Sequence, residues 1–523
     1  MPIVGSLILP DFMVPSRNKS LDSSSNHHLH APHKIGYPNG WRTGDTEEWY
    51  KSQPTTKFTH LQYRKERDSP FYHEFIILEL DNDTVCRFDR RGDVRTRTGA
   101  FAFKVRIAED TAQVIHKHEA HYADIEKNSD MLLRINFPNG QDLLTVLAVC
   151  YGVQKDYKAR AFTLTRYNCY FLCWVIIVTI ARRTVDWTVL SKDTSDWEEL
   201  VRTTIESSNA KQLGTNNRVK RGVLVGRGRE GATVRVPEIV RSLPPASTAY
   251  LTGTLRQALF STRPSIQKSL DQLILHSTVE SAMRRASLEM TKKVTGAAAR
   301  TYASQAARDA AMEAVIESTW GKRLVSGEMG QLWEDTCKAT EVAVWKAAAA
   351  AADAAEDDQV PENGPMQWES AWDKAWSDSW KEPLADQSLK DFKDSSIGQV
   401  SMRAKEAWIE AKAEACTANL EYVSLFSDAV VDYVLRNLPD SSPETLKVDM
   451  AAPKPEFHAL FASMNLESNN LKLQEYIQSQ IKDLCQRARS VGFIRTPDDI
   501  EEAMRRVWVE TIKTLDSAPT SNT

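Results

Sequence analysis

The sequence predicts an α+β N-terminal domain followed by an all-α C-terminal domain. Between about residues 55 and 137, short runs rich in β-branched and aromatic residues alternate with turn signals, which is typical of a small antiparallel sheet. Beyond residue 250, helix-forming residues dominate and prolines are confined to a few positions. At about 150 residues per domain, a chain of 523 residues is also long enough for two to four domains.

The overall composition is that of an ordinary globular protein, with 42% hydrophobic and 26% charged residues. The net charge is −4, so no overall positive field would hold nucleic acid or an anionic membrane. Seven cysteines lack the paired spacing of disulfide frameworks and zinc sites, which indicates a reducing compartment, and we expect a cytoplasmic protein. The N-terminus lacks the basic start of a signal peptide. The longest apolar run, Tyr170 to Ile180, is shorter than the roughly 20 residues of a membrane span, so we expect a buried helix.

The N-terminal half divides into two parts. Residues 1–45 are rich in Ser, Asn, His, Pro and Gly and show no apolar period, which predicts a mobile segment. Residues 46–206 should form the α+β domain, with strands in the runs FYHEFIILEL, TVCRFDRR, AFAFKVRIA and LLRINF. After the last strand, the apolar spacing from Leu143 to Tyr151 predicts one helix, and Asn168 should cap the start of a second, strongly apolar helix.

Residues 207–250 are predicted to be a basic linker rich in Gly and Pro. The run GVLVGRGREG places Gly226, Gly228 and Gly231 in a G-x-G-x-x-G pattern. However, Pro237 interrupts the helix that should follow, and no acidic residue lies about 20 residues further on to hold a ribose. We therefore predict no dinucleotide cofactor. The arginines of this stretch could contact RNA, an anionic membrane or an acidic partner, but no aromatic residues are interleaved for base stacking.

Residues 251–523 should form a helical domain rich in Ala and Trp. Four tryptophans, Trp368, Trp372, Trp376 and Trp380, are each four residues apart, which gives a slanted stripe along one side of a helix. We expect the stripe to be an intramolecular core, because four exposed rings would form an adhesive patch. The expected cover comes from Trp320, Trp333, Trp345 and Trp408. The alternative is a face that binds a protein partner.

The most informative pair of residues in the α+β domain is His73 and Cys169. His73 opens an apolar strand, so its ring can stand at a sheet edge. Cys169 follows the cap residue Asn168 and lies in the first turn of a helix, where unpaired N–H groups and the positive dipole end favour a thiolate. If this helix packs on the sheet, Cys169 can approach His73 and form the nucleophile and base of a thiol enzyme. The alternative is a small buried cysteine and a strand histidine without a catalytic role.

The order of these motifs resembles the permuted papain-like superfamily, in which the histidine precedes the cysteine. The segments FYHEFIILEL and FTLTRYNCYFLCWVII look like the His strand and Cys helix of its PPPDE isopeptidases and lecithin:retinol acyltransferase-like enzymes, over residues 60–185. The resemblance implies a cysteine-dependent hydrolase or acyl-transfer enzyme acting on an amide, isopeptide or ester carbonyl. The chain departs from these families at Tyr170 and Phe171, where they usually carry a further polar residue and a histidine. Substrate class and activity therefore stay open.

The resemblance also implies a third group on the strand TVCRFDRR. Acyltransferase-like relatives place a second polar residue there, which makes Arg87 and Asp89 candidates to orient His73, while Cys86 points to the other face. We favour Asp89. The alternative is a surface charge cluster that comprises Arg87, Asp89, Arg90 and Arg91.

Three histidines, His116, His118 and His121, invite a metal-site interpretation. On a strand, His116 and His118 share a face but His121 does not. On a helix, His118 and His121 are neighbours while His116 points elsewhere. We therefore predict a solvated polar loop and no metal.

Two functions follow from these observations. The first is a thiol enzyme without a cofactor, with Cys169 as nucleophile, His73 as base and Asp89 as orienting group. The backbone N–H groups at the start of the Cys169 helix would stabilise an oxyanion. The second is a non-catalytic scaffold, in which a silent α+β domain is joined to a helical domain that holds a protein partner.

Overall fold

The structure is a computed structural model, and it has an antiparallel sheet in the N-terminal part of the chain and mostly helices in the C-terminal part. Both halves of the predicted fold class are therefore present. The described residues are 31–67, 73–92, 108–161, 167–192, 194–207, 245–318, 330–356, 367–381, 383, 396–439, 446–450, 470–490 and 496–517.

The chain divides into two compact units. Unit 1 comprises Met1–Thr188, Ser269–Val279 and Asn437–Thr523, and unit 2 comprises Val189–Lys268 and Glu280–Arg436. This differs from the predicted single helical domain over 251–523, because the last segment adds a strand and two helices to the unit that holds the sheet. The predicted linker lies outside the described residues up to position 244, and the chain is helical from Pro245. The Gly226 motif is therefore also outside the described residues.

Unit 1 is built on a sheet whose described strands have the order β1-β5-β4-β3-β2-β6-β7, with every neighbouring pair antiparallel. The strands are β1 (His33–Ile35), β2 (Lys57–Glu66), β3 (Glu74–Leu80), β4 (Thr84–Arg91), β5 (Glu109–His116), β6 (Ser129–Asp142) and β7 (Lys447–Met450). The predicted runs match β3, β4 and the middle of β6. The run AFAFKVRIA lies outside the described residues except for Ala108, and β2 and β5 were not predicted.

Part of the predicted mobile segment has regular structure. Residues 1–30 lie outside the described residues, but β1 pairs with β5, and the helix α2 (Asp45–Ser52) follows it. Ile35 is buried in the core, and the Tyr37 hydroxyl donates a hydrogen bond to the Leu147 carbonyl at 2.7 Å. The segment has too few apolar residues for a periodic pattern, so contacts with distant residues determine its structure.

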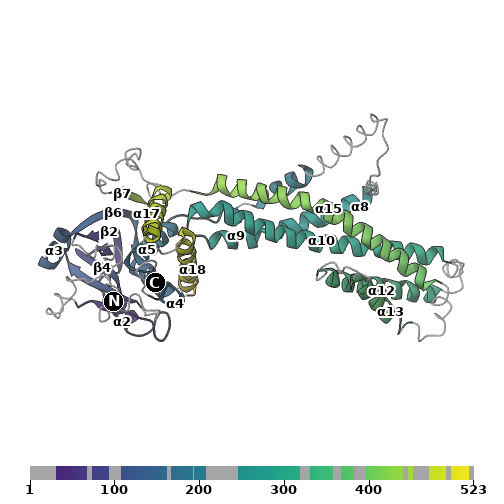
Figure 1. The fold of residues 1–523 in the computed structure, drawn as a ribbon, viewed down its shortest axis with the longest axis horizontal. Helices are drawn as coiled ribbons and strands as arrows, with labels where there is room; N and C mark the ends of the chain where they lie inside the picture. Colours follow the sequence, from purple (N-terminus) through teal and green to yellow (C-terminus); the bar gives the residue numbers. More distant parts are fainter. Residues whose placement is uncertain are drawn as a thin grey trace, which may run out of the picture. The chain divides into compact units, whose positions relative to one another are not determined.

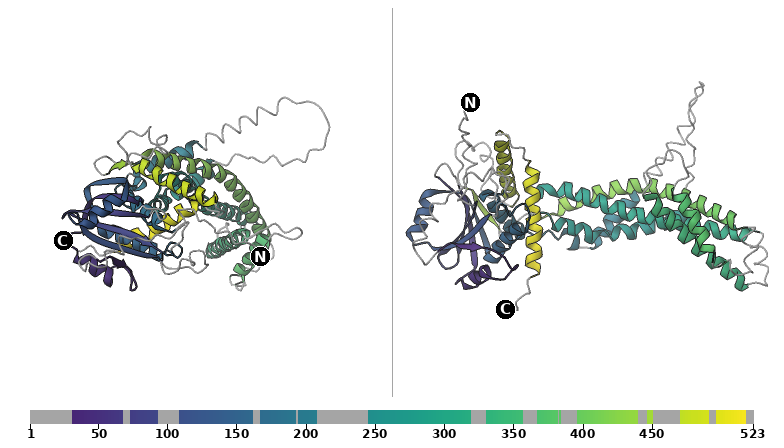
Figure 2. Two further views of the ribbon diagram at one scale, coloured as in Figure 1. Left: turned by 60° about the vertical axis from the view of Figure 1, so that its left-hand side comes forward. Right: turned by 60° about the horizontal axis from the view of Figure 1, so that its bottom comes forward.

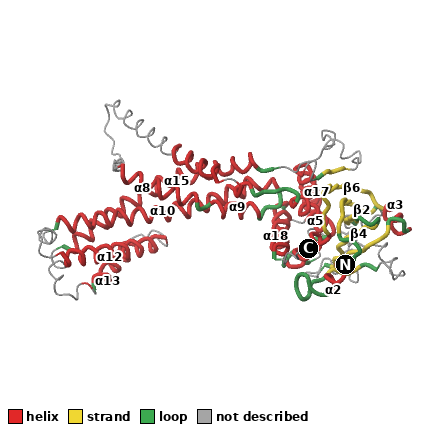
Figure 3. Tube along the Cα trace, turned by 180° about the vertical axis from the view of Figure 1, so that it is seen from behind, coloured by secondary structure: helices red, strands yellow, loops and turns green. Residues whose placement is uncertain are grey.

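The two faces of the sheet pack against different helices, because side chains alternate along each strand. Among the described elements, the face that carries Ile76 and Phe88 packs mainly against four helices, whereas the face that carries Phe75 and Ile77 packs against one. The four helices are α4 (Leu143–Lys155), α5 (Cys169–Arg183), α17 (Asn470–Ser490) and α18 (Pro497–Asp516), and the single helix is α3 (Ala120–Asn128). Figures 1 and 3 show the C-terminal helices α17 and α18 beside α5 and α4.

The helix α5 is the centre of the unit 1 core. The Asn168 side chain accepts a hydrogen bond from the Phe171 N–H at 3.3 Å, which confirms the predicted cap. Every residue from Cys169 to Arg182 is buried. Each large apolar side chain in such a helix contributes roughly 1.5–3 kcal/mol to stability. Within the described ranges, no helix combines the length and the apolarity needed to cross a bilayer.

Unit 2 is helical throughout its described residues, as Figures 2 and 3 show. Its long helices α10 and α15 run antiparallel, since Arg284 pairs with Asp428 at one end and Arg403 pairs with Glu317 at the other. The helices are α6 (Val189–Lys192), α8 (Pro245–Phe260), α9 (Arg263–Asp271), α10 (Val279–Glu317), α12 (Gly330–Glu356), α13 (Gln367–Trp380) and α15 (Ile397–Asn437), of which α9 ends in unit 1. The short helix η3 (His276–Thr278) belongs to unit 1.

The tryptophan stripe on α13 is an intramolecular core. Three of its four members, Trp372, Trp376 and Trp380, are buried, and Trp368 is half-buried. The Trp408 ring on α15 lies 5.5 Å from the Trp368 ring and 5.9 Å from the Trp372 ring. Of the other rings expected to cover the stripe, Trp345 is instead 38% exposed, and Trp320 lies outside the described residues.

Candidate functional site

His73 stands at the entrance to β3, and its ring is fully buried. Its backbone carbonyl accepts a hydrogen bond from the Glu66 N–H at 2.8 Å, which fixes this entrance beside the end of β2. The ring lies over the Phe75 ring, with 6.2 Å between the centroids. Strand pairing and packing therefore hold the imidazole in one orientation.

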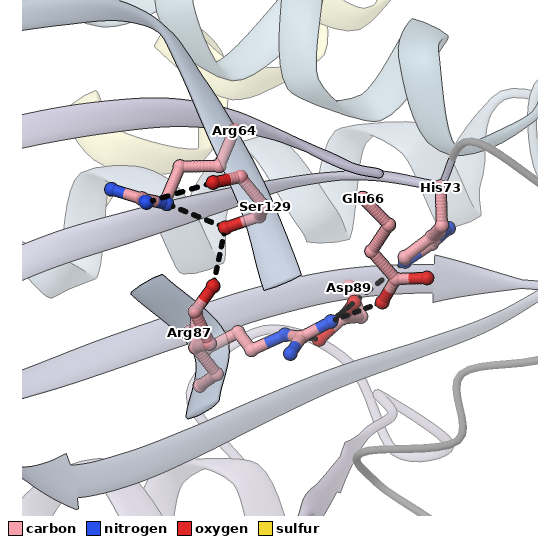
Figure 4. A network of polar contacts seen from close by, with 7 residues as sticks. Arg64, Glu66, His73, Arg87, Asp89 and Ser129 are labelled. Atoms are coloured by element: carbon pink, nitrogen blue, oxygen red, sulfur yellow. Dashed lines mark hydrogen bonds and ion pairs between the residues drawn. The ribbon is translucent and has the colours of Figure 1, made fainter. Parts of the chain in front are cut away.

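Asp89 on β4 lies next to His73, on the same side of the sheet, as Figure 4 shows. The His73 Nε2 and the Asp89 Oδ1 are 2.6 Å apart, and both side chains are buried. Because an ionised carboxylate only accepts hydrogen bonds, the imidazole Nε2–H is the donor. The structure thus brings the favoured orienting residue into direct contact with the predicted base.

Arg87 provides a second contact for the same carboxylate. Its Nε lies 2.7 Å from the Asp89 Oδ2, and its Nη2 lies 3.0 Å from the Asp89 Oδ1. The guanidinium also lies 3.9 Å above the centre of the Phe75 ring. Burial opposes ionisation of Asp89, but the charges of Arg87 and His73 outweigh it and hold the pKa of the carboxyl well below its usual range. Asp89 is therefore a carboxylate at neutral pH.

The alternative of a surface charge cluster on β4 is wrong. Arg87, Asp89 and Arg90 are each only 1% exposed. These three charges thus belong to the interior of unit 1, where each needs a partner, whereas Arg91 is half-buried.

Cys169 is the first residue of α5 and is 6% exposed. As members of the first helical turn, the N–H groups of Cys169 and Tyr170 have no partner within the helix. The helix dipole places partial positive charge at the same point. The position therefore combines a thiol with two backbone donors that can bind a developing oxyanion.

Cys169 affects the protonation of His73. Burial lowers the pKa of the His73 imidazole, but the electrostatic interaction with Cys169, followed by the hydrogen bond to Asp89, raises it to about 10. Because Asp89 occupies Nε2, Nδ1 is the ring nitrogen that can exchange a proton with the thiol. Nδ1 is buried, and no fully formed hydrogen bond joins it to any residue that the structure describes. The site therefore combines a buried imidazole–carboxylate pair with the electrostatic influence of the Cys169 thiol.

Glu74, which follows His73, is a further buried acid that the sequence analysis did not identify. Its carboxyl accepts a hydrogen bond from the Tyr63 hydroxyl, which in turn accepts one from the Trp174 indole at 3.1 Å. Lys65 on β2 lies 3.3 Å from the other carboxyl oxygen. Burial and the charge of Cys169 raise the pKa of Glu74 well above its usual range. The local signal in the sequence was a glutamate immediately before the apolar run FIIL.

The helix α17 contributes two further residues near this acid. The charge of Arg487 acts against the rise in the pKa of Glu74. Burial and the charge of Glu74 in turn raise the pKa of the Tyr476 hydroxyl above its usual range. Both residues lie about 400 positions after Glu74 in the chain, so no local sequence signal could have placed them at the site.

The three histidines of the predicted polar loop do not share one element. His116 ends β5 and His121 lies in the first turn of α3, with His118 in the turn between them. The His116 and His118 ring centroids are 5.1 Å apart. In the part of the chain that the structure describes, no group of three or more potential ligands is arranged to hold a metal ion.

Unit 1 has a hollow of about 280 Å³, and one of its lining residues shortly precedes α5 in the sequence. Tyr167, two residues before Cys169, lines one side of it. The remaining wall comes from Lys158 and from the first turns of α18, at Asp498, Asp499, Glu502 and Arg506.

Comparison of the chain with protein-family models, with curated proteins and with solved structures gave no match.

Proposed function

We propose that unit 1 is a permuted papain-like enzyme domain, with Cys169 as nucleophile, His73 as general base and Asp89 as orienting group. The observation that carries the proposal is the buried hydrogen bond of 2.6 Å between the His73 Nε2 and Asp89, with Cys169 acting on the same imidazole. Such a constellation is typical of nucleophilic catalysis, in which a base activates the nucleophile and a third group orients the base.

The arrangement supports acyl transfer through a thioester. Because the pKa of His73 is raised to about 10, its Nδ1 already holds the proton of the Cys169 thiol, and the sulfur attacks the substrate carbonyl carbon as a thiolate. The N–H groups of Cys169 and Tyr170 stabilise the oxyanion of the tetrahedral intermediate. His73 then returns the proton to the leaving amine or alcohol, and water or a second acceptor releases the acyl group. Asp89 holds the imidazole by accepting its Nε2–H throughout.

The substrate that we propose is an amide, isopeptide or ester carbonyl. This follows from the reaction that a thiol and an imidazole perform and from the resemblance of the His strand and Cys helix. We propose no cofactor, because the three side chains supply every proton transfer and bond change of the reaction.

The test uses the full chain and a small activated ester, p-nitrophenyl acetate, with intact mass measurement and peptide mapping. We expect one acetyl group on Cys169 together with a burst of p-nitrophenol. Cys169→Ala should abolish the burst, and His73→Ala should slow it by about 10²–10⁴-fold. His60→Ala is the matched control, since that ring lies on β2 outside the site.

Cys337 provides an internal control in the same experiment. It is less buried than Cys169 and lies in unit 2. If exposure alone governed acetylation, Cys337 would react first and His73→Ala would have no effect. That outcome would overturn the proposed enzyme.

A scaffold function is the second candidate, and one observation favours it. Among the described residues of unit 2, several large apolar side chains are exposed on the long helices, at Ile316, Val342, Met402 and Ile409. A non-catalytic unit 1 joined to a helical unit that binds protein would show equal acetylation of several cysteines. The same measurement therefore separates the two functions.

A further inference from the structure

Arg90 on β4 links the sheet to the segment that leads into α5. Its side chain is 1% exposed and points to the sheet face opposite that of Asp89, because successive residues of a strand alternate. Its Nη1 lies 3.0 and 3.1 Å from the two carboxyl oxygens of Asp110, directly across the strand pair in β5. The ion pair anchors the guanidinium at one place in the core.

The remaining donors of Arg90 hold the backbone on both sides of residues 162–166. The Arg90 Nε donates to the Tyr167 carbonyl at 3.2 Å, and the Nη2 donates to the Ala159 carbonyl. Tyr167 immediately precedes the cap residue Asn168, and Cys169 follows. Arg90 therefore fixes the point from which the nucleophile's helix begins.

A buried ion pair is weak evidence for a role in stability, because the desolvation of both charges offsets their attraction. Its geometric specificity is a better explanation, since a planar guanidinium can hold a carboxylate and two carbonyls at fixed directions. The neighbouring residue Asp89 orients His73. Asp89 and Arg90 are consecutive residues of β4, and their side chains lie on opposite faces of the sheet. Asp89 contacts His73, and Arg90 contacts the segment that leads to Cys169.

We propose that Arg90 is a positioning residue, which sets the distance and direction between the Cys169 sulfur and the His73 imidazole by holding the Tyr167 carbonyl. This inference rests on the proposed function, because positioning matters only if Cys169 reacts. A displacement of about 1 Å between reacting groups can slow a reaction by about 10²-fold.

The test compares Arg90→Gln and Arg90→Lys with a matched control, Arg182→Gln. Arg182 is also buried on a core element and also donates to two backbone carbonyls, those of Leu273 at 3.2 Å and Val185 at 3.0 Å. It lies at the opposite end of α5 from Cys169. The control therefore removes a similar buried contact from the same helix without changing its first turn.

The readout is the rate of Cys169 alkylation by iodoacetamide in the full chain as a function of pH, with circular dichroism to verify folding. We expect Arg90→Gln to slow alkylation at pH 7 by about tenfold or more and to shift the profile toward higher pH, since the thiol loses its alignment with His73. Arg182→Gln should leave the profile unchanged. Arg90→Lys keeps the charge opposite Asp110 and should fold, but its single ammonium cannot reach both carbonyls, so the rate should be intermediate.

The outcomes separate this inference from the proposed function. If wild-type Cys169 shows no preference over Cys337, the proposed function fails. If wild-type Cys169 reacts preferentially but the Arg90 variants and Arg182→Gln change the profile equally, or not at all, the enzyme stands and the positioning role is overturned. Should Arg90→Gln not fold, an unchanged profile in Arg90→Lys would likewise overturn it.

Discussion

Two buried ion pairs distinguish unit 1 from the described part of unit 2. In unit 1, the pairs Arg87–Asp89 and Arg90–Asp110 are almost completely buried, with exposed side-chain fractions of 1% or less. In unit 2, the pair Arg403–Glu317 is about half exposed, at 52% and 53%. Buried pairs fix geometry at a cost in desolvation, whereas exposed pairs contribute little to stability. The difference indicates that the fold of unit 1 fixes the positions of particular charged side chains.

The largest expected effect is the loss of a buried charge in unit 1. Asp89→Ala removes the carboxylate that both His73 and Arg87 contact, leaves Arg87 with its longer contact to Glu66 at 3.4 Å, and should lower the free energy of unfolding of unit 1 by about 3–5 kcal/mol. Glu317→Ala is the matched change in unit 2, and it should have almost no effect because its partner remains solvated. Urea unfolding followed by hydrogen exchange of peptides from each unit measures both. Equal effects would remove the distinction between the units.

A cavity in the core should have the next largest effect. Ile176→Ala truncates a fully buried side chain of α5 and should cost about 2–5 kcal/mol, from lost burial and the cavity that remains. Ile409→Ala on α15 removes a side chain that is 40% exposed, so it should change stability far less. Thermal unfolding of both variants tests the contrast. A large loss in Ile409→Ala would mean that this side chain is covered in solution.

Two glycines offer a smaller and opposite pair of effects. A Cβ at Gly152 on α4 would lie 2.9 Å from the Val507 carbonyl oxygen of α18, so Gly152→Ala should destabilise unit 1 by about 1–3 kcal/mol. Gly296 on α10 has no atom within 4 Å of that position, so Gly296→Ala should stabilise α10 by about 1 kcal/mol. The midpoints of urea unfolding show whether each substitution stabilises or destabilises the protein. A neutral Gly152→Ala would show that α18 can move away from α4.

A separate, pH-dependent effect on unit 1 comes from His73. Its pKa is raised from 6.5 to about 10 in the folded chain, so the folded state binds more protons than the unfolded state between these values. The stability from this group is therefore complete below pH 6.5 and is lost as pH rises to about 10, by at most about 1.4 kcal/mol per pH unit. His73→Gln should flatten this slope in urea unfolding from pH 6.5 to 9. If the slope were unchanged in this variant, other groups would account for the dependence of stability on pH.

Local patterns were sufficient to predict the elements that carry the candidate site. The apolar run after Asn168 predicted α5 and its cap, and the apolar strand after His73 predicted β3. The family resemblance, and not a local pattern, pointed to Asp89, and sequence alone could not distinguish a buried pair from a surface cluster. Burial depends on which elements cover β4, and that information is spread over the whole chain.

The parts that were missed depend on long-range pairing. The strand β7 pairs with β6 from more than 300 residues away, and α17 brings Tyr476 and Arg487 to the surroundings of Glu74. Helix-forming residues predicted the secondary structure of α17 and α18, but they did not indicate that these helices pack in unit 1. For the same reason, Arg90 showed no sign of its contact with the Tyr167 carbonyl.

The division of unit 1 among three chain segments has a consequence for synthesis on the ribosome. The sheet from β1 to β6 and the helices α4 and α5 emerge first, but α17 and α18 are translated only after all of unit 2. During that interval the apolar surface that α18 later covers, around Gly152, is open to water or to chaperones. The domain therefore completes its folding after translation has passed residue 516, and folding that depends on such distant contacts is slow. A ribosome-stalled chain ending before residue 437 would carry both reacting side chains in an unfinished core.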